Sequence, residues 1–126
     1  MPLVHHELCF GCGRTNLFGL LLEVEQTAPD EVAGRCFLKQ DHQGPDRRTA
    51  HPGVLGAALA EVMALACGLE ARIVSFEVTI GEAVPVGTFL EVQAQVERRD
   101  GPLAYAAARA VADQRMVAQA RGSFRS

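Results

Sequence analysis

One carboxylate in this sequence stands apart from its neighbours. Glu61 is the only charged residue in the long apolar run of residues 53–69. A buried carboxylate is costly unless it is paired, protonated or hydrated in a cleft. Glu61 is therefore a candidate general base or nucleophile that lines a cleft. The structural alternative is an ion pair with an arginine across a dimer interface.

A polar loop, residues 39–52, comes directly before this run. With about 14 residues it is longer than most connections between secondary-structure elements, which indicates a functional role. The loop contains His42, Gln43 and His51. Their side chains can position a substrate or a water molecule, or they can brace the loop itself.

A C-x-x-C pair lies near the start of the chain. It consists of Cys9 and Cys12, and His5 and His6 come shortly before it. This spacing is typical of zinc ligands, but a closed zinc site takes four of them. A second pair at a matching spacing is absent from the sequence. We therefore expect a structural turn here and no metal, with a zinc site and a redox pair as the alternatives.

The run around Glu61 predicts a long helix over residues 53–68. Pro52 suits the first turn of a helix because the N–H that proline lacks is not needed there. Gly68 suits the C-terminal cap. The segment is apolar nearly all round, which is typical of a buried helix. Residues 1–19 are rich in turn-forming residues and are expected to be irregular.

Alternating apolar and polar residues predict strands on both sides of this helix. Two precede it and four follow it, over residues 20–24, 32–38, 74–80, 90–96, 103–112 and 116–124. Short turns such as Asp100-Gly101 make the later strands antiparallel neighbours. An all-alanine face over residues 104–110 would let the helix lie close to the sheet. In the last strand, Met116 is expected on the same face as Phe124.

Length and charge limit the possible functions. The chain has 126 residues, and 12 basic against 15 acidic residues give a net charge of −3. This size fits one domain over residues 1–126, and the mild acidity argues against a nucleic-acid partner. No run reaches the roughly 20 apolar residues of a membrane helix. No signal peptide is evident in residues 1–10, so we expect a cytoplasmic protein.

The order of these elements resembles the hotdog fold, an α+β fold in which an antiparallel sheet wraps around one long central helix. Four local strings strengthen the resemblance: CFGCG at residues 9–13, NLFGL at 16–20, HQG at 42–44 and HPGVL at 51–55. Together they look like the CxxCG-opening, PaaI-like branch of the hotdog acyl-CoA thioesterases. The resemblance covers nearly the whole chain, with Leu17 standing where that branch usually has proline.

The resemblance implies a catalytic arrangement. In these thioesterases a backbone N–H at the helix N-terminus polarises the thioester carbonyl, and a carboxylate nine residues after the loop histidine acts as base or nucleophile. Counting nine residues from His51 leads to Ala60, and Pro52 has no N–H to donate. If the register shifts by one residue, Gly53 becomes the donor and Glu61 the acid. We favour this shifted register because it explains the carboxylate in an apolar helix.

The resemblance also implies roles for the loop and for basic residues. His51 and Gln43 would position the substrate or water, and His42 would contact the substrate. Three arginines are candidates for the phosphates of coenzyme A: Arg47, Arg48 and Arg121.

The function predicted in this way is hydrolysis of an acyl-CoA or acyl-carrier-protein thioester, without a cofactor, in a homodimer or homotetramer. Two alternatives remain open. One is a hotdog 3-hydroxyacyl-thioester dehydratase, which PGVL at residues 52–55 also resembles. It would use His42, but its acid would fall at Ala58. The other is a non-catalytic acyl-CoA-binding or regulatory protein.

Overall fold

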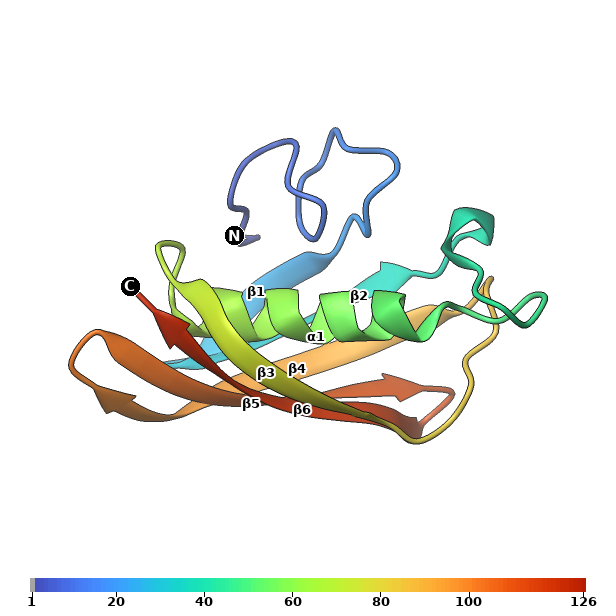
Figure 1. Cartoon of the computed structure of the whole chain (residues 1–126). Helices are drawn as coiled ribbons and strands as arrows, with labels where there is room; N and C mark the ends of the chain where they lie inside the picture. The colour runs from blue at the N-terminus through green and yellow to red at the C-terminus, as the bar shows by residue number, and fades with distance from the viewer. Residues whose placement is uncertain (1) are drawn as a thin grey trace.

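One sheet curves around one long helix in the computed structural model, which describes residues 2–126 (Figure 1). The sheet has six antiparallel strands in the order β1-β2-β4-β5-β6-β3. The elements in chain order are β1 (Glu23–Ala28), β2 (Glu31–Phe37), the 3-10 turn η1 (Gln40–His42), α1 (Pro52–Cys67), β3 (Arg72–Ile80), β4 (Phe89–Asp100), β5 (Leu103–Ala112) and β6 (Arg115–Arg125). This architecture confirms the predicted α+β hotdog fold.

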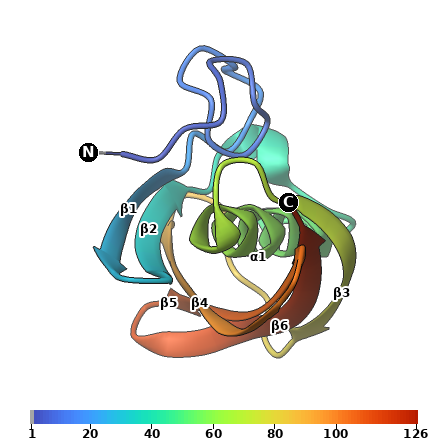
Figure 2. The ribbon, with the colours of Figure 1, turned by 90° about the vertical axis from the view of Figure 1, so that its left-hand side faces the viewer.

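The helix α1 begins and ends one residue earlier than residues 53–68. Pro52 occupies its first turn, and Gly68 follows its last residue with a φ of 132°, a conformation that glycine adopts without strain. Strands surround the helix on three sides when it is viewed along its axis (Figure 2). This explains why its side chains are apolar nearly all round. Among residues 2–126, no helix is long and apolar enough to span a membrane.

The alanine face of β5 lies against this helix, as predicted. The alanines at 104, 106, 108 and 110 are all at least 92% buried. Side chains this small let the helix axis lie near the sheet, and larger aliphatic side chains from α1 fill the space between them. Leu55, Leu59 and Val62 are completely or almost completely buried there.

The inward face of β6 differs from the prediction at one end. Phe124 is buried as expected, but Met116 is 51% exposed, and its neighbour Val117 is buried instead. The pairing of β5 with β6 shifts by one residue between Ala110 and Val111. Such a bulge reverses the alternation of side chains, which explains why Met116 points outward.

Strand β3 forms one edge of the sheet, and within residues 2–126 it pairs only with β6. Its alternation does not bury one face: four large apolar side chains on this strand are between 39% and 54% exposed, namely Ile73, Val74, Phe76 and Ile80. An apolar edge strand offers both unpaired backbone groups and apolar surface to a further strand.

The N-terminal segment, which we define as residues 2–22, lies over the side of the helix that the strands leave open (Figure 2). Its irregular path agrees with the prediction for residues 1–19, of which Met1 lies outside the described residues. Backbone hydrogen bonds attach it to β1 and close it on itself, from Leu3 N to Val24 O (2.8 Å) and from Leu22 N to Gly11 O (2.9 Å). The segment thus reaches α1 without regular secondary structure.

Candidate functional site

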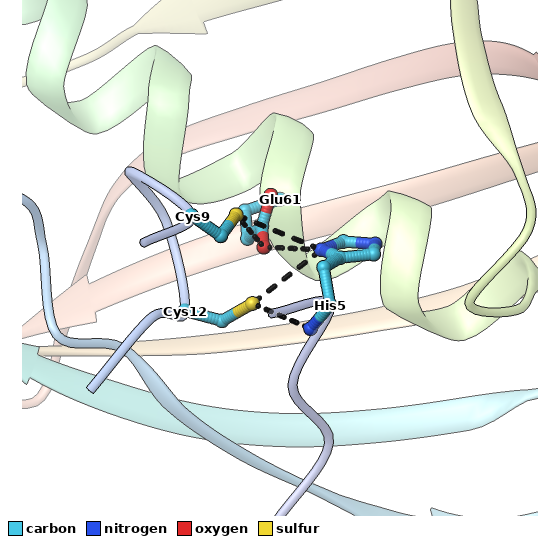
Figure 3. A group of neighbouring side chains, drawn as sticks. All are labelled: His5, Cys9, Cys12 and Glu61. Atoms are coloured by element: carbon cyan, nitrogen blue, oxygen red, sulfur yellow. Dashed lines mark hydrogen bonds and ion pairs between the residues drawn. The ribbon is translucent and has the colours of Figure 1, made fainter. Parts of the chain in front are cut away.

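Glu61 projects from the middle of α1 into the N-terminal segment, and its side chain is 14% exposed. Its Oε2 atom lies 2.9 Å from Nδ1 of His5, and the Cys9 thiol donates a hydrogen bond to the same oxygen over 3.3 Å. Figure 3 shows these side chains turned toward one another. The charge in the apolar helix is therefore satisfied by partners near the start of the chain.

Cys12 completes this group of side chains. Its Sγ atom lies 3.4 Å from Nδ1 of His5 and accepts the backbone N–H of His5 over 3.2 Å. Cys12 is 2% exposed. Burial, and then the hydrogen bond with Glu61, raise the pKa of its thiol well above the ordinary value. We call His5, Cys9, Cys12 and Glu61 the His–Cys–Glu cluster.

Two glycines allow the segment to approach the helix so closely. A Cβ atom at Gly11 would overlap Cδ and Cγ of Glu61, and one at Gly13 would overlap the backbone at Glu7 and Cys9. The N–H of Gly13 also donates to the carbonyl of Cys9 over 2.9 Å, which closes the turn that carries both cysteines. The turn predicted for the C-x-x-C pair is therefore present, and it faces Glu61.

A pocket of about 400 Å³ opens beside the cluster, between the N-terminal segment, α1 and the start of β3. Its walls are largely apolar and include Ala57, Ala60, Ile73 and Phe124, while Glu61 contributes a carboxylate. A mostly apolar concavity with a few polar and ionisable groups is the usual composition of a ligand site.

A larger depression, of about 650 Å³, lies on the outer face of the sheet. It is lined mainly by polar side chains that point away from the helix, and no member of the His–Cys–Glu cluster lines it. Arg121 is found here, with a guanidinium nitrogen 3.5 Å from a carboxylate oxygen of Glu97. We therefore regard the smaller pocket as the candidate site, because it combines apolar walls with the cluster.

The predicted oxyanion donor at the start of α1 already has a partner. The N–H of Gly53 donates to Nδ1 of His51 over 2.8 Å, so the His51 side chain caps the helix. Eight residues separate Gly53 from Glu61, which places them about 12 Å apart along the helix axis. The two groups predicted to act on one carbonyl do not meet within one chain.

The remaining loop residues brace the loop. Gln43 accepts the N–H of Arg48 over 2.6 Å and donates to the carbonyl of Gln40 over 3.1 Å. The buried His42 ring accepts the N–H of Lys39 through Nδ1 over 3.0 Å, and its Nε2 has no well-oriented partner in the described part of the chain. The side chains of Arg47 and Arg48 are exposed.

Burial and the nearby Lys39 charge lower the pKa of His42, although the Gly19 backbone and Asp41 act in the opposite direction. The two other cysteines lie outside the cluster. Burial raises the pKa of Cys36 to about 12 and that of Cys67 to about 11. These two thiols therefore stay in their neutral, unreactive form near neutral pH.

The sequence did not reveal that Glu61 meets His5, Cys9 and Cys12. The sequence contains two separate signals of this site. One is an unpaired acid in an apolar helix, and the other is a C-x-x-C pair with a nearby histidine, a set of three possible metal ligands without a fourth. About fifty residues lie between them, so only the folding of the N-terminal segment onto α1 brings them together.

Comparison with known proteins places the fold. No family model matches the chain, and no curated protein matches it in sequence. Solved structures do match it. Thioesterase superfamily member 2 from zebrafish is 21% identical, with 82% of this chain and 80% of that chain covered and a TM-score of 0.74. The PaaI protein from the phenylacetic acid degradation operon of E. coli is 17% identical, with coverage of 84% and 79% and a TM-score of 0.77.

A third structure extends over more of the chain. A thioesterase superfamily protein covers 95% of it with a TM-score of 0.85, at 18% identity and with 61% of its own length matched. The structural matches establish a common fold, but sequence identities this low leave the activity open. The six-stranded antiparallel sheet around one helix is therefore the hotdog fold, in the form found in thioesterase superfamily and PaaI structures.

Proposed function

We propose that this protein hydrolyses an acyl thioester, most simply an acyl-CoA, to the free acid and the thiol. One observation carries the proposal: the single carboxylate of the buried helix lines an apolar pocket in a fold that thioesterase superfamily structures also have. The pocket provides apolar surface for an acyl group, and Glu61 provides a base at its wall.

In the proposed reaction, Glu61 takes a proton from water as the water oxygen bonds to the thioester carbonyl carbon. The C–S bond then breaks, and the leaving thiolate takes the proton back from Glu61. As a nucleophile, the same carboxylate would instead form a mixed anhydride and expel the thiolate, and water would then hydrolyse the anhydride. In both routes the N–H of Gly53 and the positive end of the helix dipole would stabilise the oxyanion.

The separation of about 12 Å along α1 supports the proposal of a second copy. During attack, the carbonyl oxygen lies about 3 Å from the oxyanion donor and the carbonyl carbon about 3 Å from the attacking group. The separation of about 12 Å between Gly53 and Glu61 along one helix is wider than this span. We propose a homodimer, alone or paired into a homotetramer, that brings Glu61 of one copy near Gly53 of the other. The exposed apolar edge strand β3, whose residue Ile73 lines the pocket, is the proposed contact.

We base the proposed carrier of the acyl group, coenzyme A or a carrier protein, on exposed arginine side chains. Arg47 and Arg48 lie on the surface of the loop that precedes α1, where they could bind the phosphates of coenzyme A or of a carrier protein. Arg121 lies on the outer face of the sheet beside Glu97. A phosphate bound by Arg121 would therefore lie at a different place from one bound by Arg47 and Arg48. His51 and Gln43 would act on the substrate only after releasing their present partners. Four free thiols suit the proposed cytoplasmic location.

The test is an assay of free thiol released from a panel of acyl-CoA substrates. Glu61→Gln keeps the size of the side chain but removes the base, so kcat/KM should fall by about 10²- to 10⁴-fold. Glu91→Gln, which neutralises an exposed carboxylate on β4, is the matched control and should retain the wild-type rate. Equal rates for wild type and Glu61→Gln would refute the catalytic role of Glu61.

A non-catalytic acyl-CoA-binding protein is the second candidate, and one observation favours it. The proposed donor Gly53 and the proposed base Glu61 both have partners already, His51 and His5. Binding of an acyl-CoA without any release of thiol, in a calorimetric titration, would select this candidate. The dehydratase alternative loses support because His42 is buried and holds the Lys39 backbone.

A further inference from the structure

We infer that the His–Cys–Glu cluster is a binding site for one zinc ion, which fastens the N-terminal segment to the central helix. Each of its four members offers one donor atom, and these atoms all lie within 4.8 Å of one another (Figure 3). Three of them come from the N-terminal segment and the fourth, the Glu61 carboxylate, comes from α1. The fourth ligand that a C-x-x-C pair and one histidine lack is thus supplied from far along the chain.

The distances between donor atoms fit a tetrahedral zinc site. With metal–ligand bonds of about 2.0 Å to nitrogen or oxygen and about 2.3 Å to sulfur, neighbouring ligand atoms are separated by roughly 3.3 to 3.8 Å. The Cys9 sulfur lies 3.3 Å from Oε2 of Glu61 and 3.7 Å from Nδ1 of His5, and the Cys12 sulfur lies 3.4 Å from that nitrogen. The carboxylate and the imidazole, 2.9 Å apart, need to separate by only a few tenths of an ångström.

The way the groups converge distinguishes a metal site from a catalytic relay. In a nucleophile–histidine–acid relay, the two ring nitrogens face different partners, so that a proton passes through the imidazole. Here both sulfurs and the carboxylate of Glu61 all lie around the same nitrogen, Nδ1 of His5. Four donor atoms gathered within 4.8 Å of one another are the arrangement that an ion requires.

The surroundings also hold the ligands in place. The backbone N–H of His5 donates to the Cys12 sulfur, an interaction that supports a metal-bound thiolate. Gly13 permits the tight turn between the cysteines, and Gly11 lets that turn lie directly on Glu61. The site is therefore built by the fold and is not a chance meeting of flexible surface groups.

The donor set selects the ion. Two thiolates exclude calcium and magnesium, which prefer oxygen ligands. An imidazole and a carboxylate added to two thiolates make a four-coordinate N, O, S₂ set that suits zinc. Four protein ligands also close the coordination shell, which is characteristic of a structural zinc site.

This inference does not depend on hydrolysis, although both proposals involve Glu61. A bound ion engages Oε2 of Glu61, so that the carboxylate cannot at the same time act as a free base. If Glu61 is the base, zinc-loaded protein should release thiol more slowly than chelated protein. Equal rates in the two forms would refute the base role and leave the zinc site unaffected.

The experiment measures zinc bound to the full chain. Protein is incubated with zinc chloride, freed of excess ion by gel filtration and analysed for metal, and about one ion per chain is expected. Cys9→Ser combined with Cys12→Ser, and separately Glu61→Gln, should lower retained zinc at least about tenfold. Cys36→Ser and His6→Ala remove the same kinds of side chain outside the cluster and should retain it. A wild-type protein without zinc, or a double variant that binds as much, would overturn the inference.

A second measurement avoids variants that fail to fold. In wild-type protein, zinc should slow alkylation of the partly exposed Cys9 by a maleimide and should raise the Tm by about 5 °C or more, and a chelator should reverse both effects. Mass spectrometry identifies the modified cysteines, with Cys36 and Cys67 as internal references. Unchanged alkylation of Cys9 on addition of zinc would contradict the site.

Discussion

At the scale of single residues, Glu61 belongs to both parts of the candidate site, the His–Cys–Glu cluster and the apolar pocket. Its carboxylate accepts contacts from His5 and Cys9, which come from a segment without regular structure. The same side chain lines the apolar pocket beside β3. An acid that would otherwise destabilise a buried helix is therefore compensated by the segment that covers the helix.

The cap of α1 depends on one imidazole. Replacing His51 by alanine removes the acceptor of the Gly53 N–H and leaves that group without a side-chain partner. We expect a loss of about 1 kcal/mol in the free energy of unfolding, the usual effect of removing an N-cap. Urea denaturation followed by circular dichroism measures it, with His6→Ala as the control. A His51→Ala protein as stable as the wild type would show that the cap contributes nothing.

The buried imidazole of His42 makes stability depend on pH. Its pKa is lower in the folded protein than the ordinary value of 6.5, first because of burial and then because of Lys39. As the pH falls below about 6.5, the unfolded chain therefore binds a proton that the folded chain resists, and stability is lost. Denaturant midpoints at pH 7 and pH 5 should differ more in the wild type than in His42→Gln.

The difference between the two proteins isolates His42, because the other ionisable groups titrate equally in both. Asp30, whose pKa is lowered by its hydrogen bond with Arg99, titrates below this range. If both proteins lost the same stability between pH 7 and pH 5, burial of a neutral His42 would not be the cause.

Some residue roles were predictable and others were not. The position of Glu61 in an apolar helix marked it as unusual from sequence alone. Its partners were not predictable, because side-chain convergence over about fifty residues depends on how an irregular segment crosses the helix. The capping role of His51 was missed for a related reason: a loop histidine before a helix can point outward to a ligand or back to the first turn.

At the scale of elements, the distance between helix and sheet is set by small side chains. The alanine face of β5 was predicted from its spacing and is buried as expected. Asp113 and Gln114, between β5 and β6, both have positive φ, as a tight hairpin requires. Met116 was placed on the wrong face because a bulge in the β5–β6 pairing leaves no periodic signal in the sequence.

Gly56, on the buried face of α1, tests how closely the helix is packed. A Cβ atom there would have its nearest contact at 3.8 Å from Val78, which is ordinary van der Waals distance. Gly56→Ala should therefore stabilise the protein by about 0.5–1 kcal/mol through a lower backbone entropy in the unfolded chain. Thermal unfolding measures the change.

Gly122→Ala on β6 is the contrasting variant. Its Cβ would lie 2.9 Å from Phe76 Cβ and 3.0 Å from the Ser75 carbonyl, so this substitution should destabilise the protein. If both substitutions changed the free energy of unfolding by a similar amount, the space around the added Cβ atom would not determine the effect at Gly56.

At the scale of the whole molecule, the edge strand β3 is the surface through which two copies should associate. Its exposed apolar side chains include Val74 and Phe76. Val74→Lys combined with Phe76→Lys places charge on this edge, which opposes strand pairing between copies. Sedimentation equilibrium should show a dimer or tetramer for the wild type and a shift toward monomer for the variant.

Met116→Lys provides the control for this prediction, since Met116 is 51% exposed on β6, inside the sheet rather than at its edge. It should leave the molecular mass in solution unchanged. If the β3 variant also kept the wild-type mass, association through this edge would be refuted. If the variant became monomeric and also lost thiol release, the need for a second copy would be supported.

The order of the strands has a consequence for biosynthesis. Strand β3 comes directly after the helix in sequence, yet among the described strands its neighbour in the sheet is β6, which is made after β4 and β5. Until β6 is made, β3 has no strand to pair with and its outer edge is not ordered. The proposed association of two copies through this edge would therefore follow the closure of each sheet around its own helix.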